Sequence, residues 1–190
     1  PVVDQRNRVV SILSRRGRDF FIDGHEVTST SPALVVAEIG INHNGEFEQA
    51  LQLVDAALEA QADCVKLQLR DLDHLYRASN AGRHGEDLGA QYTLDLLDDV
   101  SLTTDETLKV LDYIRELGAI PFCTPWDLES ARVLKEWGIP ALKVASADLT
   151  NEPLLASLTS WGIPLIASTG MSTEADVGGA IRILERGKSP

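Results

Sequence analysis

The sequence predicts an α/β fold, a (β/α)8 or TIM barrel of which about the first five βα units are present, preceded by a short β-hairpin. Short apolar runs alternate with amphipathic stretches, which is typical of parallel strands joined by helices. Three helix exits, GAIP (118–121), GIP (138–140) and GIP (162–164), place a glycine stop just before a strand start. The first βα turn, GINHNG (40–45), lacks the G-x-G-x-x-G of dinucleotide-binding proteins, so the barrel is preferred to an open doubly wound sheet.

The first 30 residues form a separate N-terminal extension. An arginine-rich lead is followed by FFIDGHEV (20–27), in which Asp23-Gly24 lies between two β-favouring runs and predicts a hairpin. Residues 31–190 then form the barrel domain. A complete barrel takes about 250 residues and eight strands. We therefore expect a partial barrel, either a piece of a longer protein or a chain that completes itself by other means.

Five apolar runs are the predicted strands, because each is apolar on both faces, as buried parallel strands are. These runs are 34–40, 63–69, 119–125, 141–147 and 164–170. Four amphipathic stretches are the predicted helices: 47–59, 107–117, 128–137 and a last helix after Ser172. Thr103 and Glu106 have the spacing of a capping box before the second helix.

The stretch 70–102, between the second strand and its helix, is long and acidic. Residues 71–112 contain ten acids and three bases, which is −7 of the net charge of −12. Long loops in compact domains are usually functional or mobile. The stretch 70–102 is either a solvent-exposed surface loop or a lid over the substrate.

Composition excludes several classes of function. A net charge of −12 argues against a nucleic-acid partner, because phosphate backbones attract a basic face. No stretch approaches the roughly 20 apolar residues of a membrane span, and no signal peptide is recognisable, so we expect no membrane partner. Cys64 and Cys123 each lie in an apolar run, which indicates packed thiols and a reducing, cytoplasmic setting.

Polar residues occur at the predicted carboxyl end of every strand, where barrels carry their reactive groups. They are Glu38, Lys66, Gln68, Thr124, Lys143, Ser146, Asp148, Ser168 and Thr169. Lys66 and Gln68 are two apart on one strand, so they share a face, which should be the barrel interior.

Two lysines inside an apolar barrel require a partner, because an isolated buried ammonium is costly. One interpretation pairs Lys66 or Lys143 with Glu38 or Asp148 in a structural role. The other is an anion cradle, in which two positive charges and nearby hydroxyls hold a phosphate and a carboxylate. A Schiff-base aldolase lysine is a competing use. The histidines give no convergent metal-ligand set, and His43 is expected to cap its loop.

The strings AEIGINHNG (37–45), VKLQ (65–68), CTPW (123–126), KVASAD (143–148) and STGM (168–171), in this order and spacing, resemble the sialic acid synthase family. The resemblance implies an N-acetylneuraminate synthase-like transferase. Such enzymes join phosphoenolpyruvate to an N-acetylated hexosamine, such as N-acetylmannosamine or its 6-phosphate. The products are phosphate and a nine-carbon 3-deoxy-2-keto sugar acid.

The same resemblance assigns roles to the polar residues. It implies Lys66, Lys143, Ser146 and Ser168 as ligands of phosphoenolpyruvate, with Thr124 near its carboxylate. It implies Gln68 and Asp148 as residues that face the amino sugar, although the family often has Glu where Asp148 stands. It implies Glu38, with Lys66 and Lys143, as catalytic, Glu38 orienting the water that attacks C2 or handling a proton.

The resemblance also implies parts that these residues lack. A divalent metal, Mn or Mg, would polarise the sugar aldehyde in the complete enzyme, with its ligands outside this chain. The later strands and a small antifreeze-like domain, which in a homodimer covers the partner's active site, are absent. We therefore expect the complete enzyme to be active and these 190 residues alone to be inactive. The acidic loop would repel a sugar phosphate, which favours the unphosphorylated sugar.

Two other functions stay open. The first is a non-catalytic remnant that binds a phosphorylated ligand or a partner chain. The second is another barrel aldolase or a related phosphoenolpyruvate-condensing synthase. Borohydride trapping of a lysine adduct would favour the Schiff-base route over the sialic acid synthase.

Overall fold

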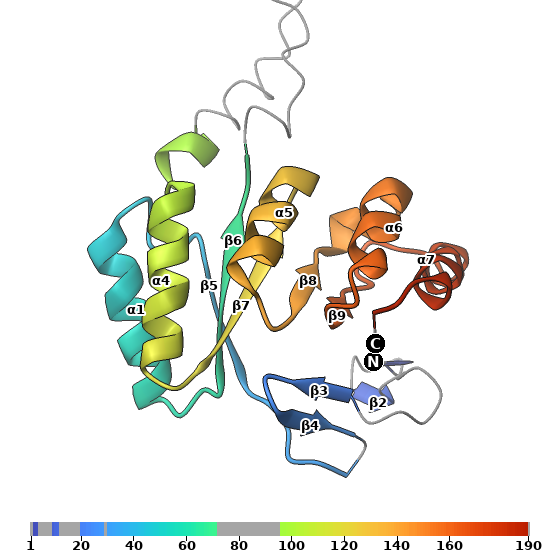
Figure 1. The fold of residues 1–190 in the computed structure, drawn as a ribbon, viewed down its shortest axis with the longest axis horizontal. Coiled ribbons are helices and arrows are strands. Elements are labelled where there is room, and N and C mark those ends of the chain that lie inside the picture. Colours follow the sequence, from blue (N-terminus) through green and yellow to red (C-terminus); the bar gives the residue numbers. More distant parts are fainter. Residues whose placement is uncertain (1, 4–8, 12–19, 29, 72–95, 190) are drawn as a thin grey trace, which may run out of the picture. The chain divides into compact units, whose positions relative to one another are not determined.

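A computed structural model describes residues 2–3, 9–11, 20–28, 30–71 and 96–189 (Figure 1). The chain divides into two compact units. The central unit is Val35–Ile139, and the terminal unit combines Pro1–Leu34 with Pro140–Pro190.

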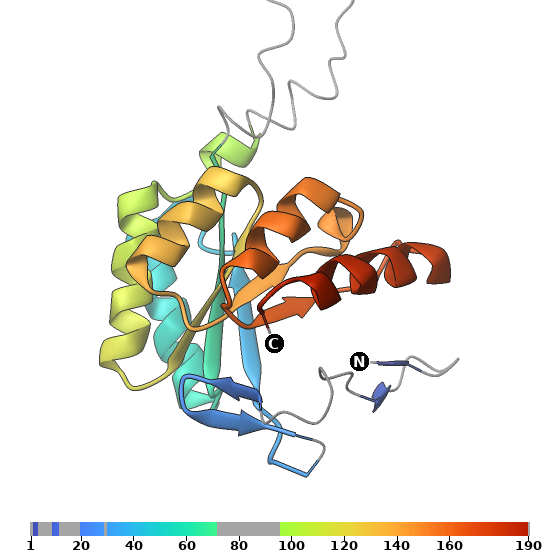
Figure 2. The same ribbon diagram turned by 45° about the vertical axis from the view of Figure 1, so that its right-hand side comes forward.

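Three parallel strands form the sheet of the central unit, in the order β5 (Val36–Gly40), β6 (Cys64–Leu69), β7 (Ile120–Pro125). Each is followed by a helix: α1 (Phe47–Glu59), α4 (Thr104–Glu116) and α5 (Leu128–Trp137). Figures 1 and 2 show α1 and α4 side by side against this sheet. Every second residue of β6 is fully buried, which leaves Lys66 and Gln68 half-buried on the opposite face.

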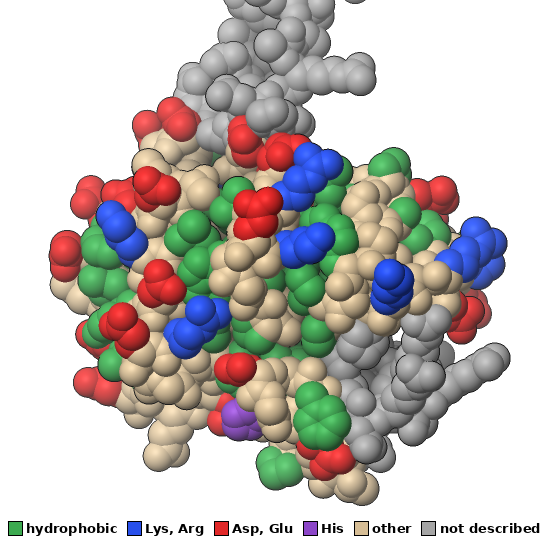
Figure 3. Space-filling model, viewed as in Figure 1, with side chains coloured by type: hydrophobic (Ala, Val, Ile, Leu, Met, Phe, Trp, Pro, Cys, Tyr) green, Lys and Arg blue, Asp and Glu red, His purple; other side chains and the backbone are tan. Residues whose placement is uncertain are grey.

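The core of the central unit lies between the sheet and these helices. Its fully buried side chains include Val54, Leu67, Leu111, Phe122 and Leu134. The solvent-facing side carries interspersed acids and bases, as Figure 3 shows for one face. Each helix therefore has an apolar face that packs against the strands and a charged face that is exposed to solvent.

Side-chain caps fix where two of these helices begin. Thr103 and Glu106 form the expected capping box at the start of α4. Asp127 caps α5, its Oδ1 accepting the backbone N–H of Ser130 at 2.7 Å. The helix predicted at 107–117 thus begins three residues earlier, because the capping box lies at its true first turn.

The terminal unit contains a second parallel strand pair, β8 (Leu142–Val144) and β9 (Leu165–Ala167). A short 3-10 helix η1 (Ser146–Asp148) and the helices α6 (Glu152–Ser160) and α7 (Glu174–Arg186) follow these strands, with α6 packed on α7. The predicted hairpin is confirmed, with β3 (Phe20–Ile22) paired to β4 (His25–Val27). A further antiparallel pair joins β1 (Val2–Val3) and β2 (Val9–Ser11).

The α/β class with five parallel strands is confirmed, and each predicted strand is present but shorter. The largest difference concerns Ser146 and Asp148, which lie in η1 and not at the end of the strand predicted at 141–147. That prediction was wrong because β8 ends at Val144, where the chain turns. Ser168 lies one residue beyond β9, although its N–H still donates to the Val144 carbonyl at 3.1 Å.

Helix α6 was not predicted. It has only nine residues and carries Pro153 in its first turn, so its apolar residues form too short a pattern to distinguish it from a loop. Most of the acidic stretch, residues 72–95, lies outside the described residues, and its role as a lid stays a prediction. No helix in the described part of the chain is long and apolar enough to cross a membrane.

Candidate active site

Four of the predicted site residues come together at the carboxyl ends of the central strands. Register pairs Glu38 with Lys66 across β5 and β6, and Gln68 with Thr124 across β6 and β7. All four lie on the face of the sheet opposite the helices, because residues two apart on a strand share a face. The structure therefore brings these four residues together, and their roles stay predictions.

Lys66 is the centre of the cluster. Its Nζ forms an ion pair with Glu38 Oε2 and donates to Thr124 Oγ1 at 3.3 Å. Burial lowers the pKa of Lys66, and the neighbouring Cys123 opposes that effect. The ion pair with Glu38 favours the charged form of Lys66. A partly desolvated ammonium with a hydroxyl beside it can bind an anionic ligand.

Gln68 is held by two residues that the sequence analysis did not single out. Its Oε1 accepts from Trp126 Nε1 at 2.9 Å and from Arg70 Nη2 at 2.5 Å. The Arg70 guanidinium also lies over the Trp126 ring, 5.1 Å from its centroid. The signal was present in the sequence, because Arg70 continues the alternation of Lys66 and Gln68, and Trp126 lies two residues after Thr124.

Gly40 ends β5 directly beneath these side chains. Its φ is +45°, and a Cβ at this position would lie 3.0 Å from both Gln68 Nε2 and Glu38 Oε1. Both the conformation and the space therefore require glycine. A donor, Gln68 Nε2, and an acceptor, Glu38 Oε1, thus both lie close to the Gly40 backbone.

The other four predicted residues belong to the terminal unit, at the ends of β8 and β9. Lys143 Nζ donates to the Val144 carbonyl at 2.7 Å. Ser146 lies beside Gly170, where a Cβ would come 3.0 Å from the serine Oγ. Asp148 Oδ1 accepts from Asn151 Nδ2 at 3.2 Å. Ser168 follows β9, so each of these four residues lies on or shortly after one of the two parallel strands.

His43 caps its loop, as expected. The side chain is buried, and its Nδ1 accepts the backbone N–H of Gly45 at 3.2 Å. Burial lowers the pKa of His43, and a hydrogen bond to the Gly40 backbone opposes this. His43 therefore stabilises the turn that follows β5. Within the described ranges, no three His, Cys, Asp or Glu side chains converge as metal ligands would.

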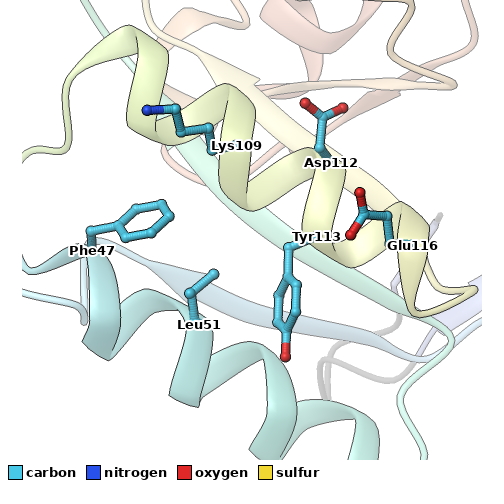
Figure 4. Close-up of a pocket in the computed structure, with 6 residues that line it drawn as sticks. All are labelled: Phe47, Leu51, Lys109, Asp112, Tyr113 and Glu116. Carbon is cyan, nitrogen blue, oxygen red and sulfur yellow. The ribbon is translucent and has the colours of Figure 1, made fainter.

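A surface hollow lies between α1 and α4 (Figure 4). Its lining consists of Phe47, Leu51, Lys109, Asp112, Tyr113 and Glu116. The Tyr113 hydroxyl donates to Asp55 Oδ1 at 2.7 Å and thereby joins the two helices. This hollow contains none of the predicted site residues, and its contacts are structural.

Comparison with known proteins adds family information to this geometry. The model of the NeuB family matches residues 53–190. The spore coat polysaccharide biosynthesis protein SpsE of Bacillus subtilis is 34% identical over 166 residues, which cover 87% of this chain and 44% of that protein. The N,N'-diacetyllegionaminic acid synthase of Legionella pneumophila is 32% identical over 158 residues, 80% of this chain and 44% of that enzyme.

A solved structure supports the same relationship. The N-acetylneuraminic acid synthetase of Leptospira borgpetersenii, crystallised with citrate, superimposes with a TM-score of 0.79 at 26% identity. The match covers 91% of this chain and 57% of that one, which confirms the partial barrel fold. The chain spans about half the length of the relatives it matches.

Proposed function

The chain belongs to the NeuB family, and from this premise we propose that the protein condenses phosphoenolpyruvate with an N-acetylated hexosamine, N-acetylmannosamine or a relative. The products are a sialic-acid-type nine-carbon 3-deoxy-2-keto sugar acid and phosphate. The observation that carries the proposal is Lys66, held between Glu38 and Thr124 at the carboxyl ends of parallel strands. This arrangement supplies a positive charge, a hydroxyl and a carboxylate at the place where barrels react.

The proposed binding roles follow from the chemistry of each side chain. The Lys66 ammonium and the Thr124 hydroxyl bind phosphoenolpyruvate, which carries both a carboxylate and a phosphate. The resemblance of the motifs assigns Lys143, Ser146 and Ser168 to the same substrate. Gln68 and Asp148 are assigned to the amino sugar.

The reaction joins C3 of the enol to the aldehyde carbon of the open-chain sugar, and the aldehyde oxygen takes up a proton and becomes a hydroxyl. Water then adds at C2, and the tetrahedral intermediate loses phosphate as its C2–O bond breaks. Glu38 accepts the proton of the attacking water, because its carboxylate lies beside the group that binds the anion. Lys66 stabilises the negative charge of the phosphate as it departs.

The proposal includes a divalent metal, Mn or Mg. The residues described here are not proposed as its ligands. The part of the chain that the structure describes has no metal-binding cluster, and no step above runs through a metal. A homodimer, a cytoplasmic location and an unphosphorylated sugar also belong to the proposal.

The test is formation of product by the full-length gene product. We expect phosphate release from phosphoenolpyruvate that depends on N-acetylmannosamine and a nine-carbon acid detectable by mass spectrometry. Lys66→Met should lower kcat/KM by about 100-fold or more, because it removes a charge-assisted contact in the site. Lys109→Met, on the exposed face of α4, is the matched control and should leave the rate unchanged.

Three outcomes would contradict the proposal. Phosphate release without a nine-carbon acid would indicate a phosphatase. A lysine adduct trapped by borohydride would indicate the Schiff-base aldolase. An active Lys66→Met variant would refute the assigned cradle.

A further inference from the structure

Gln68 has a side-chain amide whose orientation is fixed by its neighbours. Trp126 Nε1 and Arg70 Nη2 both reach the same atom, Gln68 Oε1. An indole nitrogen and a guanidinium can only donate hydrogen bonds. The group that faces them must therefore be the carbonyl oxygen, because turning the amide over would set its NH2 against two other donors.

The fixed carbonyl determines what Gln68 presents to a ligand. Its NH2 group has no hydrogen-bond acceptor among residues 30–71 and 96–189, and the side chain is half-buried. The nitrogen Nε2 and Glu38 Oε1 each lie 3.0 Å from the position that a Cβ on Gly40 would occupy. Glu38 uses its other oxygen, Oε2, for the ion pair with Lys66. One donor and one acceptor thus lie on the same side of Gly40, at the carboxyl ends of the strands.

We propose that Trp126 and Arg70 are positioning residues that hold Gln68 so that its NH2 group, beside Glu38 Oε1, receives the acceptor sugar. The Gln68 NH2 group and Glu38 Oε1 fit a ligand group that both accepts and donates a hydrogen bond, namely a hydroxyl or an acetamido group of an amino sugar. The inference rests on the proposed function for the identity of the sugar. The locked orientation of the amide rests on the geometry alone.

The energetic reason is preorganisation. A free glutamine amide presents its oxygen and its nitrogen to a ligand in turn, and binding must select one of them. Loss of one locking hydrogen bond costs roughly 1 kcal/mol, which corresponds to about a fivefold weaker binding of the sugar. The affinity for phosphoenolpyruvate, which is assigned to Lys66 and Thr124, should not change.

The chain contains a matched pair of tryptophans for the experiment. Trp137 also donates through Nε1, to Asp112 Oδ1 at 3.1 Å, and also has an arginine over its ring, with Arg115 at 3.8 Å from the centroid. Trp126→Phe and Trp137→Phe therefore remove the same chemical group from the same kind of setting. Only the first variant lies at the strand ends.

In the full-length gene product, Trp126→Phe should raise the KM for N-acetylmannosamine about fivefold, with kcat and the KM for phosphoenolpyruvate changed less than twofold. Trp137→Phe should change none of the three. Gln68→Glu keeps the locked oxygen and replaces NH2 by a second oxygen, so it should weaken sugar binding more than tenfold. A normal KM for the sugar in Gln68→Glu would overturn the proposal, because it would show that the carbonyl meets the ligand.

A second readout does not depend on activity. In protein labelled with 15N at the glutamine side chains, Trp126→Phe should shift the NH2 signals of Gln68, assigned by their loss in Gln68→Glu, while Trp137→Phe leaves them in place. Unmoved Gln68 signals in Trp126→Phe would refute the lock. A wild-type protein that forms no sugar acid but shows the shift would refute the proposed function and retain the positioning role.

Discussion

The Asp127 carboxylate accepts the backbone N–H of Asp71 through Oδ2 at 2.8 Å, although the two residues are 56 positions apart in the chain. The same carboxylate caps α5 through the N–H and the hydroxyl of Ser130. The buried Asp127 side chain therefore holds both the residue that follows β6 and the first turn of α5. Arg70 and Trp126, the residues that hold Gln68, are the immediate neighbours of this pair.

Asp127→Ala should lower the free energy of unfolding by about 2 kcal/mol or more, because it removes a cap and leaves buried donors without an acceptor. Urea denaturation measures this loss. Asp105→Ala, at an exposed position in the first turn of α4, is the control and should cost less than about 0.5 kcal/mol. Equal costs for the two variants would show that neither the cap of α5 nor the Asp71 contact stabilises the fold.

Gly40→Ala should reduce both stability and activity. The backbone penalty at positive φ is about 1–2 kcal/mol, and the added Cβ would also displace Gln68 and Glu38. Gly118→Ala is the control, because its φ of +81° carries a similar penalty while nothing lies within 4 Å of the added atom. We expect similar loss of stability in both and loss of sugar-dependent phosphate release only in Gly40→Ala. An equally active Gly40→Ala would contradict the described site.

Cys123 should make the protein less stable at alkaline pH. Burial raises the pKa of its thiol to about 12, whereas an unfolded cysteine titrates at about 8.5. Between these values the unfolded chain releases the proton and the folded chain keeps it, so the free energy of unfolding falls as pH rises, by up to about 1.4 kcal/mol per pH unit.

The measurement is urea denaturation from pH 8 to 10.5 for wild type and Cys123→Ala. Lys66 is present in both chains and interacts with Cys123, so the difference in slope reports the thiol together with its coupling to Lys66. The variant should show the shallower decline. Parallel slopes would mean that the folded thiol titrates as freely as the unfolded one.

Two glycines of the terminal unit should respond to alanine in opposite directions. A Cβ on Gly187 would overlap the side chain of Thr159, so Gly187→Ala should destabilise by about 1–3 kcal/mol. Gly178 lies inside α7, where an added Cβ meets only the Arg182 guanidinium at 3.5 Å. Gly178→Ala should stabilise by about 0.5–1 kcal/mol. Thermal unfolding compares them, and a stabilising Gly187→Ala would refute the close packing.

Much of the fold could be predicted because the signals are local. The stripe of α1 and the capping box of α4 depend on residues within two turns of each other, and both predictions were confirmed. The apolar runs likewise mark all five parallel strands. Helix α6 could not be predicted in this way, since its nine residues carry too little periodicity beside Pro153.

The candidate site divides along the same line. Alternation along β6 is enough to place Lys66 and Gln68 on one face, and it could also have found Arg70. Which oxygen or nitrogen Gln68 presents depends on Trp126, 58 residues away, and which carboxylate meets Lys66 depends on the register of β5 on β6. Spacing in the chain fixes the type and order of elements, because helices and strands repeat over short distances. Hydrogen-bond orientation and ion pairing are decided only when strands distant in the chain align, because those contacts join residues that no local pattern connects.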